Sequence, residues 1–159
     1  MKKLFILVAF VAGLFIQKSF AQDSAGQYRL SQLLSNYYGI KNALVAGNSV
    51  STSAQAAELI KTAGNIDRKL ISEASVNDLI KDATFIAETK DIKKQREHFA
   101  GLSSNMTALA KAVKLTDGPV YLAYCPMKKA NWLSGNPEIK NPYYGDAMLT
   151  CGKVVETIK

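Results

Sequence analysis

The chain has 159 residues, of which 48% are hydrophobic and 21% are charged, and its formal net charge is +7 at pH 7. This length is enough to bury the core of one ordinary domain. The basic residues are scattered, which favours a solvated surface over a nucleic-acid interface.

The first 21 residues have the pattern of a secretory signal peptide. Two lysines precede an apolar run over residues 4–16, and Ser19-Phe20-Ala21 provides small residues before a cleavage site. The apolar run is shorter than the ~20 residues that span a bilayer, so we expect no transmembrane segment after signal removal. Without the three lysines of this segment, the net charge falls from +7 to +4. We therefore expect a periplasmic or secreted protein with a single domain over residues 22–159.

Four segments show apolar residues at three- and four-residue spacing, which is typical of helices with one buried face. They lie at about residues 30–45, 51–63, 75–87 and 91–114. Gly47 is expected to end the first helix, one residue of Ser51-Thr52-Ser53 to cap the second, and Ser75 to cap the third. No proline occurs before Pro119, as uninterrupted helices require. The sequence predicts a mainly α fold, an up-and-down four-helix bundle.

From about residue 119 to residue 159 the pattern changes to a turn-rich segment. Val120–Tyr124 and Lys153–Ile158 are rich in β-branched and aromatic residues, so we expect a small antiparallel β-hairpin. That pairing would place Cys125, at the end of one strand, near Cys151, at the start of the other.

Soft sulfur donors gather in this segment. Met127 follows Cys125 by two residues, and Met148 precedes Cys151 by three. Thiolate and thioether ligands suit a soft cation such as copper(I) or silver(I), so these four residues are candidate metal ligands. Export favours a second interpretation with equal weight, in which the two cysteines form a disulfide that contributes ~3 kcal/mol. The methionines could also fill gaps in the core, as most methionines do.

Four other residues are weaker candidates. His98, the single histidine, is either an additional metal ligand or a structural residue. Trp132 either plugs the end of the bundle or stacks on a cation. If the cysteines form a disulfide, Trp132, Tyr143 and Tyr144 would form a surface that binds a protein or peptide partner. No catalytic motif is recognisable, so we expect a protein that is not an enzyme.

The order of uncommon residues in the C-terminal segment resembles a known family. The matching positions are Val120-Tyr121, Cys125-Pro126-Met127, Trp132-Leu133-Ser134, Ile139, Asn141-Pro142-Tyr143-Tyr144-Gly145, Met148-Leu149 and Cys151-Gly152. Further matches lie in the first helix (Tyr38 to Val45) and the fourth (Arg96, Phe99, Leu102, Ser103). These positions resemble an exported bacterial domain-of-unknown-function family (number 3347). The family is similar to domains appended to periplasmic adaptor subunits of copper and silver efflux systems.

The resemblance is expected to extend over nearly the whole mature chain. It implies a helical domain in periplasmic copper handling, with Cys125, Met127, Met148 and Cys151 at the soft-donor positions. The favoured hypothesis is a non-enzymatic copper(I)-binding protein that acts as a carrier or buffer in copper homeostasis or efflux. A periplasmic metal-efflux adaptor is its expected partner. The alternative is a disulfide-stapled helical module that binds a protein or peptide.

Overall fold

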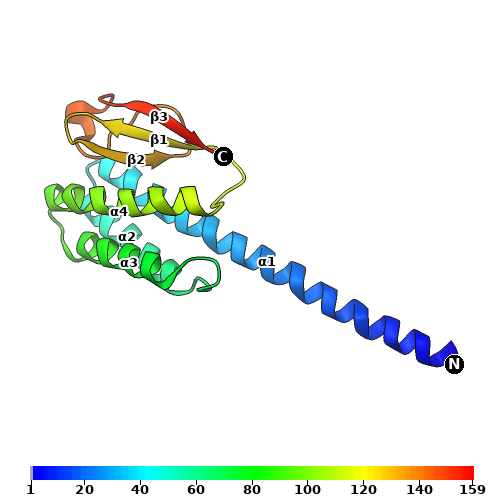
Figure 1. Cartoon of the computed structure of the whole chain (residues 1–159). Coiled ribbons are helices and arrows are strands. Elements are labelled where there is room, and N and C mark those ends of the chain that lie inside the picture. The colour runs from blue at the N-terminus through cyan, green and yellow to red at the C-terminus, as the bar shows by residue number, and fades with distance from the viewer. Residues whose placement is uncertain (1) are drawn as a thin grey trace.

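The computed structural model describes residues 24–159 with their side chains, and it consists of helices and a small sheet (Figure 1). The elements are α1 (Lys2–Val45), α2 (Ser49–Gly64), α3 (Glu73–Glu88), α4 (Ile92–Ala112), β1 (Val120–Cys125), β2 (Ala130–Ser134), the 3-10 helix η1 (Gly145–Met148) and β3 (Lys153–Ile158). The predicted signal peptide, residues 1–21, lies outside the residues described in full. Among the described residues, no helix is both long and apolar enough to cross a membrane.

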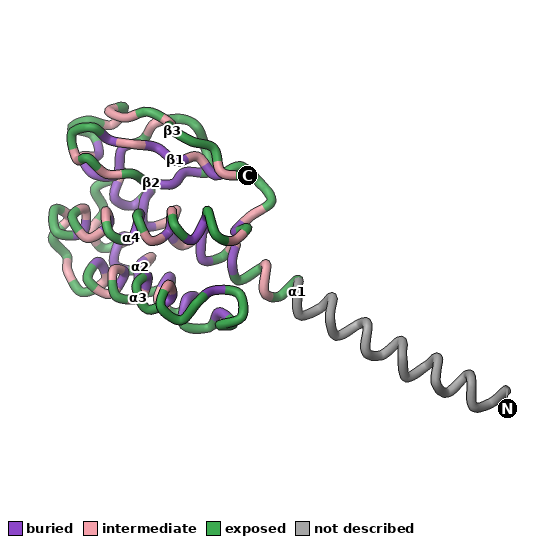
Figure 2. The backbone as a smooth tube through the Cα atoms, viewed as in Figure 1, coloured by how far each residue is buried: buried purple, intermediate pink, exposed green. Residues whose placement is uncertain are grey.

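The helices pack in chain order, each against the next, and bury one continuous core. Every helix contributes side chains with no exposed surface, among them Leu33 and Tyr37 of α1, Leu59 of α2, Ala83 of α3 and Phe99 of α4. The rings of Tyr37 and Phe99 stack with their centroids 5.3 Å apart. Figure 2 shows that the buried residues face the inside of the bundle. The predicted four-helix bundle is confirmed.

Two of the predicted helix caps were wrong by about one turn. Asn48 caps α2, because its side chain accepts a hydrogen bond of 2.9 Å from the backbone N–H of Ser51. Ser72 caps α3 in the same way and accepts from the N–H of Ser75 at 3.2 Å. Asn and Ser are nearly equal as N-caps, so composition alone does not choose between successive polar residues. Gly47 follows α1 with a φ of +67°, as its predicted role requires.

The sheet has three antiparallel strands in the order β2-β1-β3. The pairing of β1 with β3 was predicted, and it runs from Val120 opposite Ile158 to Tyr124 opposite Lys153. The strand β2 was not predicted; it pairs with the other edge of β1, where Leu133 faces Leu122. The expected two-stranded hairpin is therefore part of a larger sheet.

A buried hydroxyl joins the sheet to the bundle. The Oη atom of Tyr37 in α1 lies 2.7 Å from the Oγ atom of Ser103 in α4. The same oxygen accepts a hydrogen bond of 3.0 Å from the backbone N–H of Leu133 in β2. The sheet therefore lies over α4, while α3 lies on the other side of that helix (Figure 1).

Candidate soft-metal site

The two cysteines are free thiols that lie side by side. Cys125 is the last residue of β1, and Cys151 comes two residues before β3. Because these strands are antiparallel, with Tyr124 opposite Lys153, the end of one meets the start of the other. Cys125 is close enough to Cys151 to raise the pKa of the Cys151 thiol, so the strand pairing brings the two thiols near each other as expected.

A buried asparagine connects the two cysteines. The Nδ2 atom of Asn141 donates to the Sγ atom of Cys125 at 3.2 Å and to the carbonyl oxygen of Cys151 at 2.7 Å. Its Oδ1 atom accepts from the backbone N–H of Tyr143 at 2.8 Å, which fixes the orientation of the amide. Its own backbone N–H donates to the carbonyl of Leu149 at 2.8 Å. Asn141 therefore holds the loop that carries Cys151 against the end of β1.

The surroundings of the two sulfur atoms differ. Cys125 is buried, and its sulfur accepts from the backbone N–H of Lys128 at 3.4 Å as well as from Asn141. These two donors hold the Cys125 sulfur in a fixed position. At Cys151, desolvation raises the thiol pKa, and the neighbouring Cys125 raises it further through its charge and its hydrogen bond. A cation that binds between the sulfurs must therefore displace a proton from Cys151.

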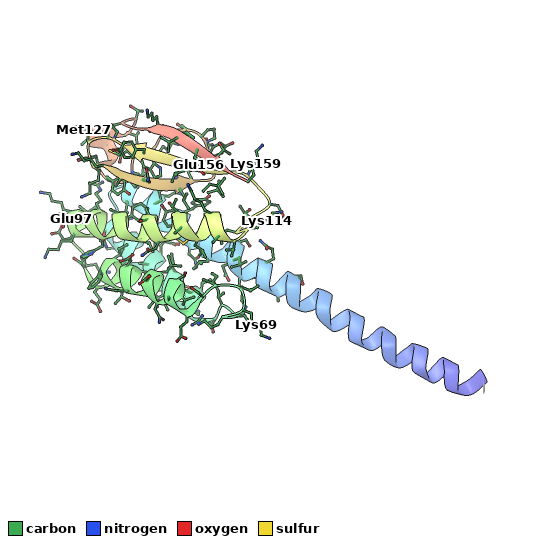
Figure 3. All side chains as sticks on the ribbon, viewed as in Figure 1. Lys69, Glu97, Lys114, Met127, Glu156 and Lys159 are labelled. Atoms are coloured by element: carbon green, nitrogen blue, oxygen red, sulfur yellow. The ribbon has the colours of Figure 1, made fainter. Side chains whose placement is uncertain are left out.

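Both candidate methionines are exposed, and each is within three residues of one of the cysteines. Met127 lies in the turn that follows Cys125 and is 61% exposed. It is labelled in Figure 3, at one end of the sheet. Met148 ends η1 and is 38% exposed; its carbonyl accepts from the N–H of Cys151 at 3.0 Å, which closes a tight turn. Met106, by contrast, is fully buried in α4. Met127 and Met148 therefore do not fill gaps in the core.

The residue after Cys151 must be glycine. Gly152 has a φ of +144°, a conformation that residues with a side chain rarely adopt. A Cβ atom there would lie 2.7 Å from the Cη2 atom of Trp132 and 2.9 Å from the carbonyl oxygen of Tyr124. The chain therefore passes closely over β1 and the indole ring, and this approach places Cys151 at the end of the sheet.

His98 lies on a different side of α4. Its imidazole ring stacks on the ring of Phe85 in α3, with the centroids 4.9 Å apart and the planes 18° from parallel. Since α3 and the sheet lie on opposite sides of α4 (Figure 1), His98 is not brought to the cysteines.

Two of the three candidate partner-binding aromatics are buried. Trp132 is 1% exposed and Tyr143 is 4% exposed, and their rings meet edge to face at 6.2 Å. The Tyr143 hydroxyl donates to the carbonyl of Asn131, and its ring packs 5.9 Å from that of Phe99. Tyr144 is half-buried. Trp132 and Tyr143 are therefore part of the contact between sheet and bundle and offer no docking surface in this fold.

Within residues 24–159, no three His, Cys, Asp or Glu side chains gather where they could hold a metal ion. A soft-metal site here would consist of the two thiols with one or both thioethers. A surface pocket of about 860 Å³ lies elsewhere, between Gly26 and Leu30 of α1 and the turn at Asp67. It contains neither cysteine, and the candidate site does not depend on it.

Asn141 is the site residue that the sequence interpretation did not assign. In the sequence it stood out only as one of the positions that resemble the family. One sequence signal could have identified it. An asparagine before proline can accept from the backbone two residues later, and this leaves its amide nitrogen free to donate elsewhere.

The profile of one protein family, described as "Protein of unknown function (DUF3347)", matches residues 33–118. The match begins inside α1 and ends before β1, so it covers the helices and neither cysteine. It is shorter than the expected match over nearly the whole mature chain. No curated protein and no solved structure matches the chain.

Proposed function

The chain belongs to this DUF3347 family, and we propose that it binds one copper(I) ion between Cys125 and Cys151 as a non-enzymatic carrier or buffer. Met127 and Met148 complete the ligand set at the surface. Silver(I), which has the same preference for sulfur, would bind at the same place. His98 is left out of this ligand set because its ring stacks on Phe85.

One observation carries the proposal. Two free thiols lie near each other at the joined ends of two strands, and an exposed methionine lies within three residues of each. Both methionine side chains are exposed, so an ion in solution can reach them. A polarisable cation explains all four sulfur positions together.

The position of the site suits exchange of the ion. The sulfur of Cys125 is buried and held by two N–H donors, whereas the methionines are open to solvent. A partner with sulfur ligands of its own could therefore approach from the methionine side while the ion remains bound to Cys125. We propose that the carrier acts in the periplasm, after signal removal, and passes the ion to a metal-efflux adaptor.

A competition titration tests the binding step. The chain lacking residues 1–21 is titrated with copper(I) under anaerobic reducing conditions against a chelator of known affinity. Tight binding of one ion that is lost in the Cys125→Ser/Cys151→Ser variant supports the proposal. Equal affinity of the wild type and the variant would remove these cysteines from the site.

The redox state of the thiols separates this proposal from the disulfide-stapled module. Two thiols in contact can bind a soft ion or become oxidised to a disulfide, but they cannot do both at once. Free thiols are counted on protein isolated from its native compartment. Two thiols per chain agree with a copper(I) site, whereas no free thiol would favour the module.

A further inference from the structure

A second surface pocket, of about 280 Å³, lies between α1 and the segment that follows β2. Tyr38 and Lys41 line it from α1, and Gly135, Glu138 and Lys140 line it from the segment after β2. Neither cysteine and neither exposed methionine borders it. Any role of this pocket is therefore separate from the soft-metal site.

Lys41 is a largely buried residue whose ammonium group has no counter-ion of its own. The whole residue is only 8% exposed. Among residues 24–159, the Lys41 side chain has no hydrogen-bond or ion-pair partner. The charges that act on it are those of Lys140 and Glu138. Glu138 is already paired with Lys140 at 3.1 Å. The Lys41 ammonium is therefore available to an anion that enters the pocket, and an anion there would compensate its charge.

Tyr38 places an unused hydrogen-bond donor at the same pocket. Its Oη atom is buried and has no partner among the described residues. It lies beside Gly135, 3.8 Å from the position that a Cβ atom of that residue would take. Burial raises the pKa of Tyr38 to about 12, so the hydroxyl keeps its proton at neutral pH. Tyr38 and Lys41 are three residues apart on a helix and therefore lie on one face.

We propose that this pocket binds a small carboxylate, with one oxygen facing the Lys41 ammonium and the other accepting from the Tyr38 hydroxyl. Two oxygens match the two unused donors, and a single negative charge matches the one unpaired cation. A dianion such as phosphate would bring a second negative charge toward Glu138. The pocket therefore selects a monocarboxylate over phosphate.

The electrostatics of Lys41 agree with this assignment. Burial lowers the pKa of Lys41, the positive charge of Lys140 lowers it further, and Glu138 raises it. A bound carboxylate beside the ammonium would raise the pKa again, because an opposite charge stabilises the protonated form.

The experiment is an NMR titration of the isotope-labelled chain with sodium acetate at constant ionic strength, followed at the backbone amides of residues 134–141. Saturable shifts are expected for the wild type. Lys41→Met, which keeps an aliphatic stem, should weaken acetate binding on the order of tenfold. Tyr38→Phe should weaken it less, and Lys93→Met, at an exposed site on α4, should leave it unchanged. Sodium phosphate at the same ionic strength should give no saturable shifts.

Shifts that rise linearly with acetate, or that persist unchanged in Lys41→Met, would overturn the proposal, as would tighter binding of phosphate than of acetate. If Lys41→Met does not fold, Tyr38→Phe decides, because it removes only the hydroxyl. Amide shifts that stay unchanged away from the substituted residue show that each variant is folded.

Discussion

The Nδ2 atom of Asn141 donates to the Sγ atom of Cys125 at 3.2 Å, and this hydrogen bond joins a loop residue to the last residue of β1. The same amide reaches the carbonyl oxygen of Cys151. The distance between the thiols is therefore set by a third side chain as well as by the strands. If the thiols bind copper(I), Asn141 is a positioning residue for both ligands.

Asn141→Ala should weaken the fold and the metal site together. Loss of the amide leaves buried groups without partners, which costs about 1–3 kcal/mol in the free energy of unfolding. Loss of a group that orients metal ligands lowers metal affinity roughly 10–100-fold. Urea unfolding and the copper(I) titration measure the two effects. The control is Asn131→Ala, at an exposed position in β2. Unchanged copper(I) affinity in Asn141→Ala would show that Asn141 does not orient the ligands.

Gly152→Ala should be among the least tolerated substitutions near the site. A Cβ atom would meet the Trp132 ring at 2.7 Å, and the φ of +144° would be strained. We expect a loss of about 1–3 kcal/mol in the free energy of unfolding. Gly118→Ala is the matched control, because a Cβ atom there has nothing within 4 Å. Equal unfolding curves for the two variants would mean that the chain can move away from Trp132 without cost.

Met127→Leu/Met148→Leu tests the thioether ligands separately from folding. Leucine keeps the apolar volume and removes the sulfur, and both side chains are exposed, so stability should change little. Copper(I) affinity should fall, by less than in the double cysteine variant. Met106→Leu changes a methionine of the core instead. It should alter the free energy of unfolding and leave copper(I) affinity unchanged. Full copper(I) affinity of the surface variant would leave a site made of thiols alone.

Copper(I) affinity should rise with pH. The pKa of the Cys151 thiol is raised above its usual value, so the thiol is protonated at neutral pH and the cation must displace that proton. Each displaced proton increases the apparent association constant about tenfold per pH unit below the thiol pKa. Titrations at about pH 6 and about pH 8 measure this slope. A flat profile would show that Cys151 does not bind as a thiolate.

The helices and the main strand pairing could be predicted because both depend on local patterns. The apolar spacing from Leu30 to Val45 specifies one buried face, and β-branched runs mark Val120–Tyr124 and Lys153–Ile158. The strand β2 has no such pattern. It is short, it includes Asn131, and it follows two lysines in a tight turn. Its place in the sheet depends on Tyr37, whose hydroxyl accepts from Leu133 across 96 positions of the chain.

The candidate site was predictable in part for the same reason. The pairing of β1 with β3 brings Cys125 and Cys151 to the same end of the sheet, so their proximity could be predicted from the sequence. The exposure of Met127 and Met148 could not be predicted from the sequence, because most methionines fill gaps in the core. Both side chains lie on the surface in the structure. The burial of Trp132 and Tyr143 also depends on tertiary packing, since both rings lie where the sheet meets α4.

The central claim is that a soft ion is held by sulfur alone, and the X-ray absorption spectrum of the copper(I)-loaded chain tests it most directly. The account predicts a first coordination shell of sulfur atoms only, which loses its thiolate contribution in Cys125→Ser/Cys151→Ser. A shell dominated by nitrogen or oxygen ligands in the wild type would contradict it, because neither the thiols nor the thioethers would then be binding the ion.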